Sequence, residues 1–246
     1  MRRPSGGLWS HSDFLKLWSG QSISELGSQV SGLAIPLLAA FNLHASAFQF
    51  SLLGVLGFLP FILFALPAGV WVDRLRRRYI LIVGDAVRAV LLAIIPILWA
   101  LGELQVWHLL ILEFLIGVFT VFFDVAYQSY LPALIEREDL IDGNSKLQLT
   151  ASVASVSGPP MAAALMAAIG AANAILADCA SFVASTVFMV SMRHREEPPK
   201  PEPGQKHPKM WPQVKEGLNW VVRHPWLRPI AMCTGTSNFF STLSNA

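Results

Sequence analysis

Long apolar runs separated by short polar turns make up most of the chain. Six of these runs are long enough to cross the roughly 30 Å hydrocarbon core of a bilayer as a helix. They cover about residues 14–42, 47–72, 79–101, 106–130, 147–169 and 173–192. A further apolar run begins near Leu227 and reaches the last residue, Ala246. The pattern predicts an all-α integral membrane protein with six complete spans and the beginning of a seventh.

The composition agrees with this class and narrows the possible functions. Hydrophobic residues make up 54% of the chain and charged residues 14%, against about 25% charged residues in an average soluble domain. A formal net charge of +2 does not suggest a nucleic-acid partner. Cys179 and Cys233 lie in apolar runs, and the six histidines form no pair at metal-binding spacing. We therefore expect no cofactor and no metal, and a membrane-embedded enzyme is poorly supported.

Between the second and third spans, the apolar run stops at one acid and four arginines. These residues are Asp73, Arg74, Arg76, Arg77 and Arg78. Arginines beside a span collect on the cytoplasmic side of the membrane, and the turns predicted on the other side contain no lysine or arginine. The sequence therefore predicts a plasma-membrane protein with a cytoplasmic N-terminus. Setting this orientation is one interpretation of the arginine turn, and a functional role is the other.

After the sixth span the composition changes. Residues 193–209 contain five prolines among charged residues, as exposed linkers do. Residues 210–228 combine apolar and charged positions at helical spacing, which predicts an amphipathic helix on the membrane surface. The predicted units are a six-helix bundle at 1–192, a cytoplasmic linker with this helix at 193–228, and an incomplete seventh span at 229–246.

The first span carries a polar face. Gln21, Glu25, Ser28 and Gln29 are spaced i, i+4, i+7 and i+8, which places them on one side of a helix. Such a face avoids lipid, and at 1.5 Å per residue Glu25 lies near the middle of the membrane. An acid at that depth is a functional candidate by default. The alternative is an acid that is solvated or paired for structural reasons.

Two other spans contain charged residues. Glu113 and Asp124 in the fourth span are eleven residues apart, close to three helical turns, so both face nearly the same direction. Asp124 is either a coupling site or a structural anchor at a hydrated mouth. Asp85 and Arg88 in the third span are three residues apart, and we expect a structural ion pair near the inner end.

Six spans, an arginine turn after the second and a long linker after the sixth resemble the N-terminal half of a major facilitator superfamily transporter. The residues that match the superfamily's motif between its second and third helices are Gly69, Asp73, Arg74, Arg77 and Arg78. The superfamily usually has a glycine where this chain has Arg76. The resemblance implies two inverted three-helix repeats, a substrate site between two such halves, and a latch on a cytoplasmic gate at this motif.

The fifth span adds a second resemblance. Gly158 and Pro159 are similar to a weakened form of the fifth-helix motif of proton-coupled exporters, with alanines in place of three of its glycines. Other short phrases resemble the branch that contains macrolide and enterobactin exporters. The fourth-helix arginine that many drug:proton antiporters use in coupling is absent from this sequence.

The resemblance implies a secondary transporter in the lipid bilayer that exports amphipathic, drug-like or siderophore-like small molecules in exchange for protons by alternating access. Glu25, with Asp124 or Glu113, would carry the proton, because a buried carboxyl group favours its protonated form. The expected contacts to the substrate come from Gln21, Ser28 and Gln29. The alternative is a truncated, non-transporting product, or a half that needs a C-terminal half or partner chain, because the sequence stops inside the seventh run.

Overall fold

The computed structural model describes residues 7–193, 196, 214, 219–220 and 222–245, and all regular structure in these residues is helical. The long helices are α1 (Ser12–Leu37), α2 (Ala47–Val72), α3 (Arg77–Ala100), α4 (Val106–Leu134), α5 (Leu140–Ile169), α6 (Ala171–Ser191) and α8 (Leu227–Asn245). Short helical turns are η1 (Gly7–Ser10), η2 (Leu38–Asn42), which continues α1, and η3 (Arg137–Asp139). The described helices that are long and apolar enough to cross a membrane number six, which confirms the predicted fold class. Most of the predicted linker and amphipathic helix lies outside the described residues.

The largest difference from the predicted bounds is in α5, which begins at Leu140 rather than near residue 147. Asp142 and Lys146 form an ion pair one helical turn apart on this added length. The hydroxyl of Ser145 donates to the carbonyl of Ile141 at 2.7 Å. Polar residues can extend a helix beyond the hydrocarbon core, because water surrounds them there. An apolar run therefore marks the membrane span without marking the whole helix.

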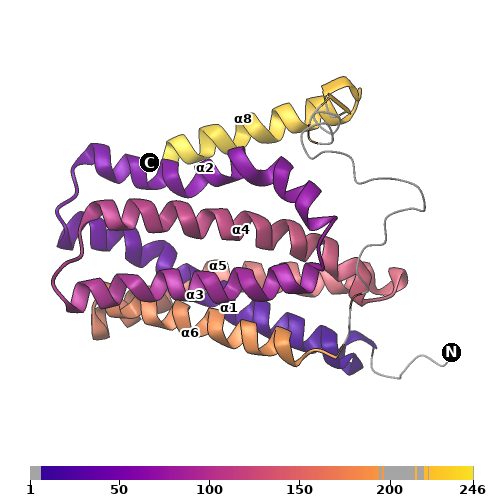
Figure 1. Cartoon of the computed structure of the whole chain (residues 1–246), viewed down its shortest axis with the longest axis horizontal. Helices are drawn as coiled ribbons and strands as arrows, with labels where there is room; N and C mark the ends of the chain where they lie inside the picture. Colours follow the sequence, from indigo (N-terminus) through magenta and orange to yellow (C-terminus); the bar gives the residue numbers. More distant parts are fainter. Residues whose placement is uncertain (1–6, 194–195, 197–213, 215–218, 221, 246) are drawn as a thin grey trace.

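The six spans run lengthwise in Figure 1, and each is antiparallel to the next in sequence. At one end, drawn on the right, α1 begins, α2 meets α3, α4 meets α5, and α6 finishes. We call this the arginine end, because its turn between α2 and α3 contains Arg74 and Arg76. At the opposite end, Gly170 has a φ of 84°, which lets α6 follow α5 almost directly. Helix α8 lies outside this bundle, and its side chains Ile230 and Met232 are exposed.

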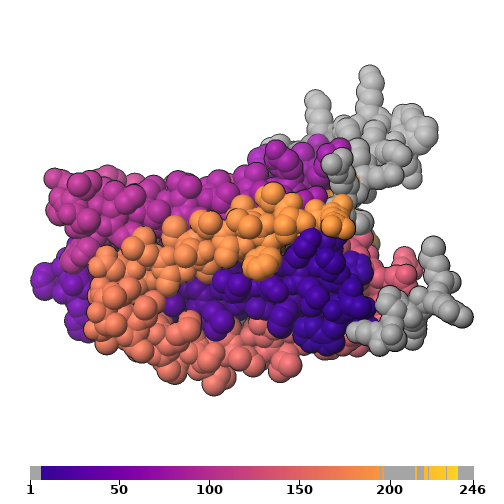
Figure 2. Space-filling model, turned by 90° about the horizontal axis from the view of Figure 1, so that it is seen from below, coloured from indigo at the N-terminus to yellow at the C-terminus, as the bar shows by residue number. Residues whose placement is uncertain are grey.

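The helices pack side by side in the order α2, α4, α3, α6, α1, α5. Figure 2 shows one part of this arrangement, with α1 (indigo) between α6 (orange) and α5 (salmon). Exchanging α1 with α4, α2 with α5 and α3 with α6 only reverses the order. Because α1 and α4 start at opposite ends of the bundle, the two three-helix units are related by an approximate two-fold axis between α3 and α6. This confirms the predicted inverted repeat.

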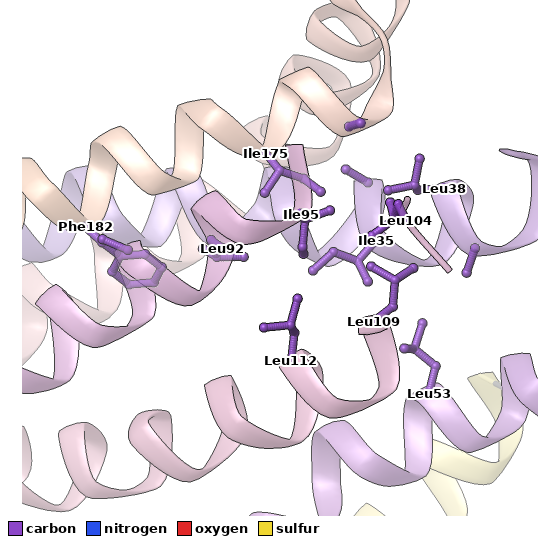
Figure 3. Close-up of a cluster of buried hydrophobic side chains, with 14 residues drawn as sticks. Ile35, Leu38, Leu53, Leu92, Ile95, Leu104, Leu109, Leu112, Ile175 and Phe182 are labelled. Atoms are coloured by element: carbon purple, nitrogen blue, oxygen red, sulfur yellow. The ribbon is translucent and has the colours of Figure 1, made fainter. Parts of the chain in front are cut away.

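Two large apolar clusters fill much of the bundle, one toward each end, and a small third one joins Val30, Ala162 and Ala174. Figure 3 shows the cluster toward the opposite end, where Leu92 and Ile95 of α3 meet Leu109 and Leu112 of α4. The cluster toward the arginine end is built around the fully buried ring of Tyr130. Between them lies a set of buried polar side chains, which are Ser24, Ser31, Asp85, Arg88, Asp178, Ser181 and Ser185. We call this set the polar layer.

Candidate functional site

Arg88 is the positive charge of the polar layer. It lies halfway along the 24 residues of α3, rather than near the inner end as expected, and its side chain is only 5% exposed. Its guanidinium contacts the carboxylate of Asp85, which is fully buried one turn earlier on the same helix. The rings of Phe123 on α4 and Phe182 on α6 each lie 4.3 Å from the guanidinium carbon. Ion pairing and two cation–π contacts together offset the cost of burying this charge.

Asp178 is a second buried acid of the polar layer, on α6, and is 2% exposed. The hydroxyl of Ser181 lies 3.0 Å from its Oδ1 and 2.7 Å from its backbone oxygen. Helix α1 comes very close at this point, because a Cβ added to Gly27 would lie 2.6 Å from Asp178 Oδ1. Only a residue without a side chain allows α1 and α6 to approach so closely around a carboxyl group.

Ser185 lies beside the carboxylate of Asp85 and links α6 to α3, but the two groups form no well-aligned hydrogen bond. On its other side Ser185 faces Gly20 of α1, where an added Cβ would lie 3.2 Å from the hydroxyl oxygen. The polar layer therefore connects α1, α3 and α6 through side chains that are each buried. These three helices are consecutive in the packing order.

A cavity of about 600 Å³ reaches the polar layer from the side of the opposite end. Arg88 and Asp178 form part of its wall, together with Ser28 of α1 and Glu113 of α4. Glu113 faces Gly57 of α2, where an added Cβ would lie 3.1 Å from its Oε1. No hydrogen bond or ion pair to Glu113 occurs among the described residues. This cavity is mostly apolar, with one unpaired acid on its α4 wall.

A smaller cavity, of about 180 Å³, lies toward the arginine end between α1, α4 and α5. Gln21 and Glu25 line it from α1, Tyr127 from α4, and Asn144 and Gln148 from α5. The hydroxyl of Tyr127 is buried and has no hydrogen-bond partner in the part of the chain that the structure describes. An acid and several hydrogen-bonding groups thus share a space nearer the arginine end than the larger cavity.

Asp124 borders neither cavity, although it is close enough to Arg88 and Glu25 to interact with both charges. Arg88 also attracts Glu25 and Asp178 electrostatically. The structure therefore gathers four acids from α1, α3, α4 and α6 around one arginine. On α4, Glu113 borders the larger cavity, whereas Asp124 lies near the charges of Arg88 and Glu25. The two acids expected to face the same direction therefore have different surroundings.

Gln29, which is expected to contact substrate, packs on α5. A Cβ added to Gly158 would overlap the Cβ and Cγ of Gln29, so the glycine is where α5 meets α1. Pro159 beside it is exposed. A second link between these helices is the indole of Trp18, which donates to the hydroxyl of Thr150 at 3.0 Å.

Two arginines of the motif between α2 and α3, Arg77 and Arg78, bind the end of α6 and the segment after it. Arg77 lies 3.9 Å from Asp73 and 3.2 Å from Glu196. The guanidinium of Arg78 donates to three carbonyls at the end of α6, those of Met189, Val190 and Met192, at 2.9 to 3.2 Å. Cations stabilise a helix C-terminus, where carbonyls lack donors. Gly69 lies within α2, and Arg74 in the turn after it.

Helix α1 holds the same end of α6. The carboxylate of Asp13 accepts a hydrogen bond from the backbone N–H of Arg193 at 3.0 Å, and Lys16 donates to the carbonyl of Ser191 at 2.6 Å. The arginine motif is thus part of a larger junction of α1, α3 and α6 at the arginine end.

Reasoning from the sequence missed Asp178 as a candidate site residue. A signal for it exists, because Asp85-Ala86-Val87-Arg88 on α3 and Asp178-Cys179-Ala180-Ser181 on α6 begin at the ninth and eighth residues of their helices. Comparing the two halves of the inverted repeat would have paired the two aspartates. No group of three or more potential metal ligands occurs within the described residues.

An inverted repeat of membrane helices with buried charges midway is typical of membrane transporters. The family model of the Major Facilitator Superfamily matches residues 17–245. The chain therefore belongs to the Major Facilitator Superfamily and is a multi-pass membrane protein. No solved structure matches the chain significantly.

Curated relatives are exporters or transporters by name. The chain is 30% identical to macrolide efflux protein A of Streptococcus pyogenes over 73% of its own length and 44% of the relative. It is 27% identical to the uncharacterized MFS-type transporter YfiS of Bacillus subtilis, over 87% and 50% of the two chains. It is 26% identical to the multidrug efflux pump Tap of Mycolicibacterium fortuitum, over 84% and 51%. The chain spans about half the length of these relatives.

Proposed function

We propose that this chain forms the first half of a transporter that exports amphipathic small molecules in exchange for protons by alternating access. The observation that carries this proposal is the pair of cavities on either side of the polar layer, one bordered by Glu113 and the other by Glu25. A transporter needs such an arrangement, because its central site must be reachable from each side in turn.

Glu25, with Asp124 or Glu113, carries the proton in this proposal. An ionised carboxylate away from water is costly, so a change in access to water changes whether it keeps its proton. Arg88 attracts Glu25 and Asp124, and it gives the bundle a buried positive charge although the fourth-helix arginine of many drug:proton antiporters is missing. Proton loss toward one side of the membrane and uptake from the other would then follow the movement of the helices.

The larger cavity is the proposed place for part of the substrate. Its volume of about 600 Å³ lies within the range of roughly 300–1,000 Å³ typical of small-molecule sites. Phe50 and Phe182 offer apolar contact there, while Ser28 and Glu113 offer polar contact. This mixture suits an amphipathic molecule, in agreement with the macrolide and multidrug names of two relatives.

We further propose that the arginine end faces the cytoplasm and that a second six-helix unit completes the transporter. The first point follows from the arginines at that end. The second is supported by the length of the relatives and by α2 and α5, which lie at the two ends of the packing order. Apolar side chains of α5 such as Val153 and Val156 are exposed. If the mature product is a 27.0 kDa chain, the unit must come from a partner chain.

The test uses inverted membrane vesicles that contain the complete product of the reading frame. Their lumen is acidified to impose a proton gradient, and export is measured as uptake of the substrate into the lumen. Glu25→Gln should slow gradient-driven transport of a fluorescent macrolide by about 5- to 150-fold, the effect of losing roughly 1–3 kcal/mol of coupling. Glu103→Gln is the matched control, because Glu103 is an exposed acid in the turn before α4. Unchanged efflux and unchanged pH dependence in Glu25→Gln would exclude this residue from coupling.

A further inference from the structure

The approximate two-fold axis of the bundle brings two aspartates into corresponding places. Asp85 on α3 and Asp178 on α6 lie at nearly the same position of helices that pack against each other across this axis. Both are almost completely buried. Three residues later in each helix, however, α3 has Arg88 and α6 has Ser181. The two repeats therefore share this buried aspartate, but only the first has an arginine that compensates its charge.

Arg88 forms its ion pair with the aspartate of its own helix, Asp85. Its guanidinium contacts Asp85 and is held between the rings of Phe123 and Phe182. Asp178 is close enough to Arg88 to interact with its charge, but Asp178 and Arg88 form no ion pair within 4.0 Å. One arginine and two buried aspartates leave one negative charge in excess, unless an acid binds a proton. Burying an uncompensated charge is far more costly than keeping the group neutral.

The neutral groups around Asp178 are hydroxyls, which can form a hydrogen bond with either form of its carboxyl group. From α6 it has the hydroxyl of Ser181, from α1 the hydroxyl of Ser31, and from α3 the charges of Arg88 and Asp85. Among the described residues, α5, which also packs on α6, places no charged side chain near it. The oxygen of Ser31 is buried and forms no well-aligned hydrogen bond with any described residue. The hydroxyl of Ser31 can accept from a protonated carboxyl or donate to a carboxylate, so it can serve either form of Asp178. The protonated form is favoured because Asp178 is buried and has no cation within 4.0 Å among the described residues.

We propose that Asp178 is a proton-binding site that sequence reasoning did not identify. In this structure its carboxyl group holds a proton and donates a hydrogen bond to the hydroxyl oxygen of Ser31. On release, the proton passes from the carboxyl oxygen to water in the larger cavity, which Asp178 borders beside Glu113. The resulting carboxylate then draws on the hydroxyl of Ser181 and on Arg88. The role of this proton in transport rests on the proposed function, but its binding does not.

A proton at Asp178 would couple the acids beside the two cavities electrostatically. Asp178 and Glu113 meet the larger cavity, Glu25 meets the smaller one, and Arg88 lies between them with electrostatic contact to Glu25, Asp124 and Asp178. A proton bound at Asp178 weakens the attraction of this residue for Arg88, which leaves the arginine to the other acids. Protonation on one side of the polar layer therefore favours ionisation on the other.

The experiment is infrared spectroscopy of the purified chain in lipid bilayers, with ¹³C in the side-chain carboxyl carbon of aspartate only. The label separates aspartic from glutamic acids, so Glu25 and Glu113 do not contribute to the shifted band. At neutral pH we expect one labelled band from a protonated carboxyl group. Asp178→Asn should abolish it, whereas Asp85→Asn should leave it in place. Ser31→Ala should shift its frequency, because the hydrogen bond from the carboxyl group is lost.

Absence of any labelled carboxyl band at neutral pH overturns the proposal, and so does a band that survives in Asp178→Asn. Loss of the band only in Asp124→Asn would assign the proton to α4 instead and equally overturn it. Ser31→Ala keeps the test valid if Asp178→Asn does not fold. If the band behaves as expected but efflux needs no proton gradient, the transport proposal fails and the proton site stands.

Discussion

Replacing Gly27 with alanine tests the close approach of α1 and α6. The added Cβ would lie 2.6 Å from both Asp178 Oδ1 and Ser181 Cβ, so at least one helix must move. Overpacking of this kind costs about 1–3 kcal/mol. Alanine also has a higher helix propensity than glycine, which returns about 1 kcal/mol. The two effects partly cancel, so a measurement on this variant alone would understate the clash.

Gly32→Ala provides the matched control. Gly32 lies on the same helix, and an added Cβ there meets nothing within 4 Å. Both variants gain the same helix propensity, so their difference isolates the contact with α6. Gly27→Ala should therefore have a free energy of unfolding about 1–3 kcal/mol lower than that of Gly32→Ala.

The assay is unfolding of the purified chain by titration of a denaturing detergent into mixed micelles, followed by circular dichroism. Equal unfolding free energies for the two variants would refute the reasoning, because they would show that α1 and α6 do not approach at Gly27. A lower stability of Gly32→Ala would refute it as well, since it would place the tight contact on the wrong turn of α1.

Two further predictions concern the same stability measurement. Arg88→Gln leaves a buried carboxylate without its cation and should lower the free energy of unfolding by about 3–5 kcal/mol; exposed Arg76→Gln should change it little, and equal effects would contradict the buried charge pair. Thr150→Val removes the acceptor for the Trp18 indole and should cost about 1 kcal/mol. Thr186→Val, which loses only a bond to its own helix, should cost less, and the reverse order would contradict the link between α1 and α5.

Much of the fold is readable from the order of apolar and polar residues. The bounds of α2 agree with the run at 47–72, and each of the other spans contains most of its predicted run. The predicted start of α5 was wrong by about two turns, because the polar stretch at 142–146 interrupts the apolar run while the helix continues into water. The inverted repeat came from family resemblance rather than from any residue pattern, and the packing order confirms it.

The candidate site was less predictable. Glu25, Asp124 and Glu113 were chosen for their depth in the membrane, which spacing along one helix can estimate. Gln29 shares a helical face with Glu25 but packs against Gly158, since neighbouring positions on one face can meet different helices. Asp178 was overlooked because its significance depends on α3 and α1, which are far from it in sequence.

Membrane insertion, the number of spans and the alternation of their direction follow from the amino-acid order alone, because hydrocarbon thickness and backbone hydrogen bonding leave only helices of a certain length. Which acids share an arginine, which hydroxyl lacks a partner and which side of the polar layer each cavity reaches depend on how the helices pack. These properties arise where side chains from distant segments come within a few ångströms of one another. A pattern along one helix carries no information about that distance.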